Sequence, residues 1–362
     1  MAFTILIVFF SLLGLIVLHE LGHFVLAKKF GVKVEEFGVG LPPRLFGKKF
    51  GETIYSLNLL PFGAFVKLEG EEGNAQSARS FGAKPVWQRF LIILGGVASF
   101  WFVAAIIFGI LGVTAGIPSV VEDNDVGNIN NAQVQVIAIA NDSPAGIAGI
   151  KVGDTITQLT IGNEQLTIGK VKEVQDFVDE SKGKEIIITI KRGNDVFDVS
   201  LTPRMFPPEG QGAMGVGLIR TAQLTYPWYR APYQGVALTG KTTLGIVESF
   251  VGIISGIIKG QGTPSGMQVV GPVGIIGEMK NAFNLGVGYF LYFLATISVY
   301  LAIFNILPIP ALDGGKTLFL AIEAVRKKPI SAKVEQKVTA AFFMLLIALM
   351  ILVSIKDVAK LF

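Results

Sequence analysis

The feature that most constrains this chain is the segment LHELGHF, residues 18–24, which contains both of its histidines. His19 and His23 are four positions apart, so on an α-helix they lie one turn apart on the same face. Glu20 follows the first histidine and completes an HExxH pattern. In this pattern two imidazoles bind one Zn²⁺ and the carboxylate takes a proton from water. The segment therefore predicts a helical zinc site with His19 and His23 as ligands and Glu20 as the catalytic base.

The pattern lies within an apolar segment that is long enough to span a bilayer. Residues 1–18 carry no charged side chain, and the apolar run resumes at Phe24. Ionisable groups at membrane depth cost about 2–3 kcal/mol each on insertion scales and as a rule have a function. We interpret Ala2–Ala27 as a retained transmembrane helix, because it has neither the basic start nor the cleavage site of a signal peptide. The alternative is a helix end from which the histidines reach the lipid headgroups.

The composition indicates an integral membrane protein. Hydrophobic residues make up 51% of the 362 residues and charged residues only 16%, which is too apolar for a soluble protein. There is no cysteine, which excludes disulfides and thiolate ligands and leaves histidine and carboxylate ligands for a metal. The net charge of +4 is spread over loops, so no nucleic-acid partner is expected.

Apolar segments and loop charges predict four transmembrane helices. The spans after the first are expected at Phe90–Ile117, Leu285–Leu307 and Val338–Ile355. Residues 28–89 contain 10 Lys/Arg and 6 Asp/Glu, so the positive-inside rule places this loop in the cytoplasm and the N-terminus outside.

The segment Val236–Ile258 is ambiguous, because it is apolar but contains Lys241 and Glu248. A span here would place the lysine-rich residues 314–340 outside the cell, against the positive-inside rule. We therefore expect an amphipathic interfacial helix within residues 226–260.

The loop after the first span contains an unusually apolar β-hairpin. Residues 53–68, TIYSLNLLPFGAFVKL, have the pattern of two strands around a turn at Pro61-Phe62-Gly63. One interpretation is that this hairpin packs on the helices. The other, which we favour, is that it dips into the membrane beside the zinc site and offers a strand edge to a substrate.

Residues 118–230 have the opposite charge balance, 14 Asp/Glu against 10 Lys/Arg, as expected for an extracytoplasmic domain. A strand is predicted at Gln133–Ile139, a helix start capped at Asp142-Ser143, and a hairpin from strands at 185–191 and 196–202. With NDSPAGIAGIKVGDTI, this order resembles a bacterial PDZ domain. The resemblance assigns the carboxylate-binding loop to residues 214–218, where the domain either binds the C-terminus of a peptide or only occludes access.

A catalytic zinc needs a third protein ligand and an open position for water. The candidates are Asp313, in NILPIPALDGG, and Glu323, in LFLAIEAV. Asp313 lies in glycine-flanked backbone that lets a short side chain approach a metal. Glu323 has Arg326 and Lys327 at helical spacing, which predicts an ion pair. We favour Asp313, and Glu323 remains the alternative.

Together, HELGH, FGVGLPPRLF, NLLPFGAFVKLEG, the PDZ-like insertion and NILPIPALDGG resemble the site-2 protease family of intramembrane zinc metalloproteases. The match is closest to the bacterial sigma-E-protease type, with one PDZ domain where the type member has two. The resemblance implies His19, His23 and Asp313 as zinc ligands and Glu20 as the base. It also implies Asn305 as a substrate-binding or oxyanion-stabilising amide, for which ordinary interhelical hydrogen bonding is the alternative. Ser99 stands where the family usually has asparagine.

The expected protein is thus a polytopic α-helical membrane protein with a membrane-associated β-hairpin and one inserted α+β PDZ domain. Its expected parts are an N-terminal membrane part, a PDZ domain, an interfacial helix and a C-terminal membrane part, at residues 1–117, 125–222, 226–260 and 285–362. The resemblance implies a multi-pass protein of the bacterial inner membrane. It would cleave transmembrane segments of single-pass proteins, such as anti-sigma factors or remnant signal peptides, near the cytoplasmic face. The rivals are a non-catalytic PDZ scaffold with a vestigial metal site and a metal or proton transporter.

Overall fold

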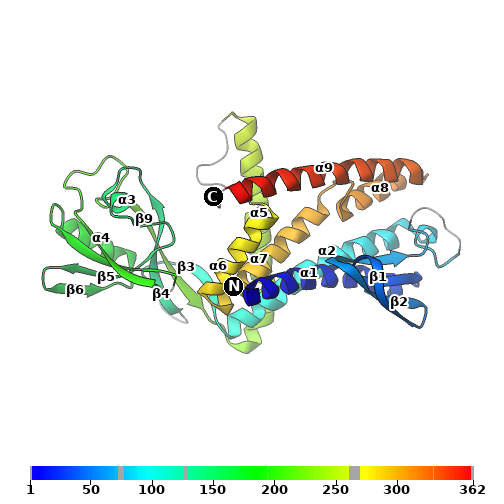
Figure 1. The fold of residues 1–362 in the computed structure, drawn as a ribbon, viewed down its shortest axis with the longest axis horizontal. Coiled ribbons are helices and arrows are strands. Elements are labelled where there is room, and N and C mark those ends of the chain that lie inside the picture. Colours follow the sequence, from blue (N-terminus) through cyan, green and yellow to red (C-terminus); the bar gives the residue numbers. More distant parts are fainter. Residues whose placement is uncertain are drawn as a thin grey trace. The chain divides into compact units, whose positions relative to one another are not determined.

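The computed structural model describes residues 2–71, 77–125, 129–193, 195–260, 270–328 and 330–359, without the side chains of Ala2 and Phe62. The chain divides into two compact units (Figure 1). A helical unit comprises Met1–Gly109, Pro232–Phe283 and Phe293–Phe362. A β-rich unit comprises Ile110–Ala231 and Asn284–Tyr292.

Among the described residues, five helices are long and apolar enough to cross a membrane. They are α1 (Ala2–Lys29), α2 (Val86–Val113), α5 (Ala231–Ile258), α7 (Val287–Ile306) and α9 (Ala332–Ala359). The predicted spans correspond to α1, α2, α7 and α9. The span predicted at Phe90–Ile117 was misplaced at both ends, because α2 begins at Val86 and ends at Val113, and Ile117 already begins a strand.

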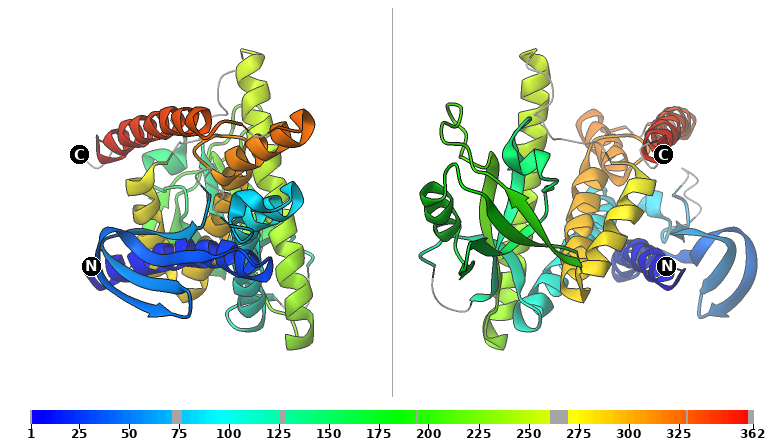
Figure 2. Two further views of the ribbon diagram at one scale, coloured as in Figure 1. Left: turned by 90° about the vertical axis from the view of Figure 1, so that its right-hand side faces the viewer. Right: turned by 60° about the vertical axis from the view of Figure 1, so that its left-hand side comes forward.

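The fifth candidate, α5, leaves the predicted count of four spans unconfirmed. Its segment Trp228–Ile258 has the lowest mean hydropathy of the five, 1.4 against 1.9–2.8. Within the helical unit, α5 runs crosswise to α1 in Figures 1 and 2. Two shorter helices, α6 (Pro272–Leu285) and α8 (Asp313–Arg326), and the 3₁₀ turn η1 (Phe81–Ala83) accompany the long helices.

The backbones of helices α1 and α2 approach each other closely at two glycines, Gly22 and Gly95. A Cβ atom added to Gly22 would overlap the carbonyl of Gly95, and one added to Gly95 would lie 2.8 Å from the carbonyl oxygen of Gly22. Small residues of this kind let helix backbones approach closely in membranes. A buried apolar cluster also connects α1, α2 and α8 to the root of the β-hairpin, where the chain enters β1 and leaves β2. Its residues are Ala27, Val32, Val34, Leu68, Phe81, Ile92, Ile93 and Leu320.

The predicted hairpin is part of a larger structure. β1 (Val34–Phe50) and β2 (Thr53–Leu68) are two long strands that pair antiparallel with several irregularities. Phe37 lies opposite both Tyr55 and Val66, so β1 pairs with both arms of a bent β2. The bend coincides with the predicted turn, where Gly63 has φ +94°, a backbone conformation that glycine adopts without strain. The prediction of a hairpin within 53–68 therefore missed β1 as the partner.

Ion pairs fix the root of this hairpin. The Glu52 carboxylate accepts hydrogen bonds from Lys28 Nζ at 2.7 Å and from both terminal nitrogens of Arg79 at 2.7 and 2.8 Å. These donors, Arg79 first, lower the pKa of Glu52 to about 2. Lys33 Nζ lies 2.7 Å from the Glu69 carboxylate.

The β-rich unit is built on a seven-stranded sheet whose main path is β3-β9-β4-β5-β7-β8, with β6 paired to β5. Its strands are β3 (Ile117–Val121), β4 (Ile129–Ile139), β5 (Thr155–Ile161), β6 (Glu164–Thr167), β7 (Ile186–Arg192), β8 (Asp195–Leu201) and β9 (Val216–Leu224). Its helices are α3 (Pro144–Ile147), α4 (Val171–Glu180) and the 3₁₀ turn η2 (Trp228–Arg230).

The local predictions for this unit are confirmed. The predicted strand Gln133–Ile139 lies within β4, and β7 and β8 form the predicted hairpin. Ser143 caps α3, because its hydroxyl accepts a hydrogen bond from the Gly146 amide. The core is a cluster of branched aliphatic side chains from neighbouring strands, including Val134, Ile156, Ile186, Ile188 and Ile190.

Candidate metal centre

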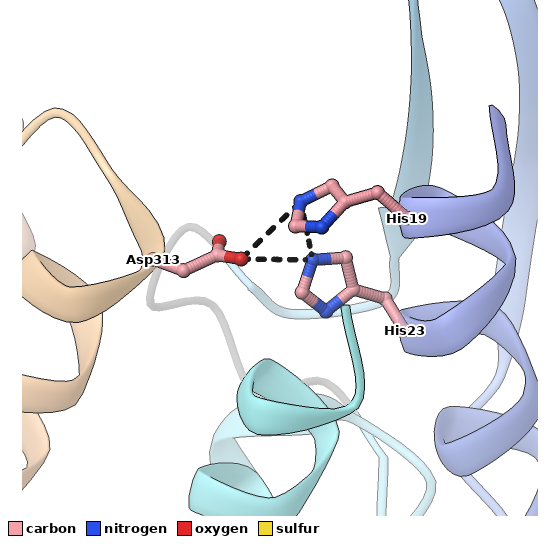
Figure 3. Close-up of side chains that lie close together, drawn as sticks. All are labelled: His19, His23 and Asp313. Atoms are coloured by element: carbon pink, nitrogen blue, oxygen red, sulfur yellow. Dashed lines mark hydrogen bonds and ion pairs between the residues drawn. The ribbon is translucent and has the colours of Figure 1, made fainter. Parts of the chain in front are cut away.

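The structure brings His19 and His23 of α1 together with Asp313, the first residue of α8 (Figure 3). The two histidine Nε2 atoms are 3.3 Å apart. Asp313 Oδ2 lies 3.3 Å from Nε2 of His19 and 3.2 Å from Nε2 of His23. A zinc ion with bonds of 2.0–2.1 Å has its tetrahedral ligands about 3.3 Å apart. The three donor atoms therefore stand at the spacing of one face of a zinc tetrahedron.

The surroundings of the three donors also fit a cation. The side chains of His19, His23 and Asp313 are only 10%, 12% and 14% exposed. Asp313 Oδ2 is buried and receives no hydrogen bond from the described residues. A buried carboxylate oxygen without a donor is costly, and a metal ion would satisfy it. Two imidazoles and one carboxylate form a ligand set that catalytic zinc uses.

His23 is oriented by a hydrogen bond. Its Nδ1 lies 2.9 Å from the carbonyl oxygen of Ile92 on α2, so Nδ1 carries the proton and donates it to that carbonyl. This contact leaves Nε2 free as the ligand atom, as in most metal sites that contain histidine.

His19 is oriented mainly by packing. Its ring stacks on Phe100 of α2, with centroids 4.7 Å apart and planes 16° apart. Phe100 is fully buried, and its carbonyl accepts a hydrogen bond of 2.8 Å from the hydroxyl of Ser298 on α7. Between the two rings, a Cβ atom on Gly96 would overlap His23 and would lie 2.8 Å from Cε1 of His19. Only glycine leaves room for both ligands at this position.

Two glycines place Asp313 at the metal centre. A Cβ atom on Gly314 would overlap the carbonyls of Ile306 and Leu307, and one on Gly315 would overlap Ile309. The start of α8 therefore lies directly against the backbone that ends α7. This close approach explains why two glycines follow the predicted ligand.

One face of α8 carries three contacts at helical spacing after Asp313. Lys316 Nζ lies 2.5 Å from Glu71 Oε1, and Leu320 is buried in the apolar cluster at the hairpin root. Glu323 accepts two hydrogen bonds from Arg89 of α2, at 3.1 and 2.5 Å.

Glu323 is thus held in an ion pair and stands apart from the converging ligands. The predicted partners were wrong, however, because Glu323 forms its ion pair with Arg89 rather than with Arg326 or Lys327. The side chains of Arg89 and Glu323 are only 11% and 18% exposed, so this largely buried ion pair connects α8 to α2.

The remaining predicted residues have different surroundings. The carboxyl group of Glu20 is close enough to His23 and Asp313 to interact with them electrostatically. Asn305 donates a hydrogen bond of 2.9 Å from Nδ2 to the carbonyl of Leu301 in its own helix. Ser99 likewise donates to the carbonyl of Gly96 at 2.6 Å.

Phe100 and the Ile92 carbonyl, which orient the two histidines, were missed by the sequence reasoning. Phe100 is one apolar residue in an apolar helix, and every residue has a carbonyl, so neither leaves a signal in a single sequence. The pair Arg89–Glu323 joins residues 234 positions apart, and no local pattern predicts it.

A cavity of about 350 Å³ in the β-rich unit coincides with the predicted carboxylate-binding loop. It lies between α4 and the segment before β9, and its lining includes Val174, Val178, Met214, Gly215 and Leu218.

Comparison with known proteins places the chain in a family. Residues 7–349 match peptidase family M50. The inferred zinc metalloprotease CPE1693 of Clostridium perfringens is 36% identical over 358 residues, which cover 97% of this chain and 98% of that protein. The regulator of sigma-W protease RasP of Bacillus subtilis is 27% identical over 429 residues, covering 96% of each chain. The zinc metalloprotease RasP of Oceanobacillus iheyensis is 27% identical over 450 residues, covering 99% of this chain and all of that one.

One solved structure matches part of the chain. The PDZ domain of the SdrC-like protein from Listeria monocytogenes is 21% identical, covers 26% of this chain and 92% of that domain, and has a TM-score of 0.21. This score is too low to support an argument about the fold, so the PDZ assignment stays a prediction. The family match, in contrast, spans the membrane helices and all three converging donors. The chain belongs to peptidase family M50, the site-2 protease family, and is a zinc metalloprotease of the membrane.

Proposed function

We propose that this protein cuts transmembrane segments of single-pass membrane proteins at a zinc site held by His19, His23 and Asp313. The observation that carries the proposal is the convergence of these three donors at 3.2–3.3 Å, with both histidines in an apolar helix long enough to span a membrane. When bound, zinc supplies Lewis acidity and lowers the pKa of water at its open position to about 7.

The chain's own residues supply the remaining chemistry. Glu20 takes a proton from the attacking water, a role favoured by its position beside the ligands. It later gives that proton to the leaving amine. Asn305 is proposed to hold the substrate or stabilise the oxyanion. In that role its amide must exchange the hydrogen bond to Leu301 for one to the substrate.

A helical substrate hides its carbonyls and must unwind locally before it is cut. We propose that the β1–β2 hairpin holds the unwound segment as an added strand. The hairpin is long, and several of its apolar side chains are exposed, among them Leu41, Leu45, Phe46, Leu57 and Leu60. Such a surface suits a lipid or substrate environment better than water.

The expected orientation follows from loop charge. We propose that the N-terminus and the β-rich unit are extracytoplasmic and that the zinc site lies toward the cytoplasmic face of the bacterial inner membrane, since residues 28–89 are basic. In this topology α5 lies at the interface, which its crosswise course and low hydropathy favour. The alternative is a fifth span.

The β-rich unit is proposed to act as a size filter that excludes substrates with large external domains. The alternative is capture of a newly cut C-terminus in the 214–218 loop. Two acidic side chains, Asp176 and Asp179, line the cavity at this loop. They disfavour a carboxylate there, and this supports the filter.

The test is reconstitution in lipid vesicles with single transmembrane peptides, with and without a chelator. Cleavage within the membrane-spanning sequence that stops on chelation and returns with zinc is the expected result. Zinc binding without cleavage of any peptide would instead favour the alternative function, a non-catalytic PDZ scaffold with a vestigial metal site.

A further inference from the structure

The ion pair Lys316–Glu71 joins two elements to which the proposed function gives different tasks. Lys316 lies one helical turn after the zinc ligand Asp313 on α8. Glu71 lies three residues after the end of β2, the second strand of the pair proposed to hold the substrate. Lys316 Nζ and Glu71 Oε1 are 2.5 Å apart, and the side chains are 45% and 27% exposed.

The other ion pairs at the hairpin root do not reach α8. Lys28 and Arg79 bind Glu52, and Lys33 binds Glu69. Among the ion pairs of the described residues, Lys316–Glu71 is the one that links the hairpin and its root to the ligand helix. Along α8, Lys316 also lies nearer to Asp313 than Leu320 does. Leu320, one turn later, makes the apolar contact with the hairpin root.

The position of this tie matters because of how a strand presents its peptide bonds. A strand advances about 3.3 Å per residue, and neighbouring residues point to opposite faces. Movement of the hairpin against α8 by about 3.3 Å would therefore bring a different peptide bond of an added strand to the zinc. A tie close to Asp313 resists such movement.

We propose that Lys316 is a positioning residue that sets the register between the hairpin and the metal centre and so determines which peptide bond is cut. This proposal rests on the proposed function, in which the hairpin holds the substrate as a strand. Lys316 also interacts electrostatically with Asp313 and Glu20. A role through that charge alone would alter the rate of cleavage and leave the cleaved bond unchanged.

The experiment compares the wild type with Lys316→Met, Glu71→Gln and the charge-reversed double variant Lys316→Glu/Glu71→Lys. Each is reconstituted with a transmembrane peptide, and the products are mapped by mass spectrometry. Zinc content should be unchanged in the two single variants. The KM should rise about 2- to 5-fold, the range for an exposed ion pair. A second product, displaced by one or two residues, should appear.

Two variants should keep the single wild-type product. The first is Lys316→Arg, which retains the ion pair. The second is the control Lys182→Met, which removes an exposed ion pair in the β-rich unit, Lys182–Asp179 at 2.8 Å. The double variant should regain a single principal product.

A single unchanged product from both Lys316→Met and Glu71→Gln would overturn the proposal. Loss of zinc in Lys316→Met would also overturn it, because Lys316 would then support the metal directly. A wild-type protein that cuts no peptide would refute the proposed function and the register role with it. An unchanged product from the variants refutes the register role alone.

Discussion

Gly96→Ala should disable the metal centre although Gly96 is not a ligand. The added Cβ atom would lie 2.8 Å from Cε1 of His19 and would overlap Nε2 of His23. Ordinary carbon contacts begin at about 3.5 Å, so the His19 ring must move by about 0.7 Å and the His23 ring by more. Zinc sites tolerate errors of about 0.2 Å in ligand distance.

Neither ring is free to make this movement. His23 is held by its hydrogen bond to the Ile92 carbonyl, and His19 by its stacking on the buried Phe100. A misplacement of about 1 Å at a catalytic site costs on the order of 100-fold in rate. We therefore expect zinc affinity and peptide cleavage to fall by about 100-fold or more.

The assay is zinc content of the purified variant, measured by elemental analysis and by competition with a chelator, followed by turnover of a transmembrane peptide. Gly14→Ala is the matched control, because it lies in α1 with nothing within 4 Å of its added Cβ atom. Gly95→Ala tests packing alone, since its Cβ atom would meet Leu26 and the Gly22 carbonyl rather than the ligands. Wild-type zinc affinity and turnover in Gly96→Ala would refute this account of the site.

Three further predictions follow from the structure. Alanine at each proposed ligand, His19, His23 and Asp313, should abolish tight zinc binding, whereas Glu323→Gln should retain it; loss of zinc from Glu323→Gln with retention by Asp313→Ala, measured by metal analysis, would contradict the proposed ligand set. Deleting residues 125–222 should let the enzyme cut full-length substrates if the β-rich unit is a filter; full-length substrates that stay uncut, with a raised KM for trimmed ones, would favour capture. Glu52 has a pKa lowered to about 2, so its ion pairs stabilise the fold above its unfolded value of 4.5 and lose this effect as pH falls toward 2. Thermal unfolding should show Glu52→Gln less stable than the wild type at pH 7 and equal to it near pH 2; a pH-independent difference would count against this linkage.

The three residues that converge at the candidate zinc site could be predicted from the sequence, because each carries a chemical constraint that few residues meet. Two histidines at helical spacing with an adjacent glutamate are unusual in an apolar helix. With no cysteine in the chain, a carboxylate had to complete the set. Asp313 was favoured by its glycine neighbours, and the structure gives the physical reason, since Gly314 and Gly315 lie against the backbone that ends α7.

The residues that orient these ligands could not be predicted, because their roles exist only in three dimensions. Phe100 and the Ile92 carbonyl lie on a different helix from the histidines. The same reason explains the partner of Glu323. Local spacing offered Arg326, but tertiary packing places Arg89 against it.

The strands show a similar limit. Alternation of apolar and polar side chains predicted β4, β7 and β8. The pattern of β4 is regular, and β7 and β8 pair with each other and are close in sequence. The apolar residues 53–68 were interpreted as a self-contained hairpin because they have the pattern of two strands around a turn at residues 61–63. The adjoining segment β1 contains Pro42 and Pro43, which are unfavourable in a regular ladder. The structure pairs β1 with β2 around these residues and leaves irregularities in the register.

The central claim is that Glu20 acts as the base of a zinc endopeptidase within the membrane. The most direct measurement compares the wild type and Glu20→Gln in lipid vesicles, with zinc content and cleavage of one transmembrane peptide determined on the same samples. The account predicts equal zinc in both proteins, cleavage within the membrane-spanning sequence by the wild type, and none by the variant. Cleavage by Glu20→Gln at a rate near that of the wild type, or loss of its zinc, would contradict the claim.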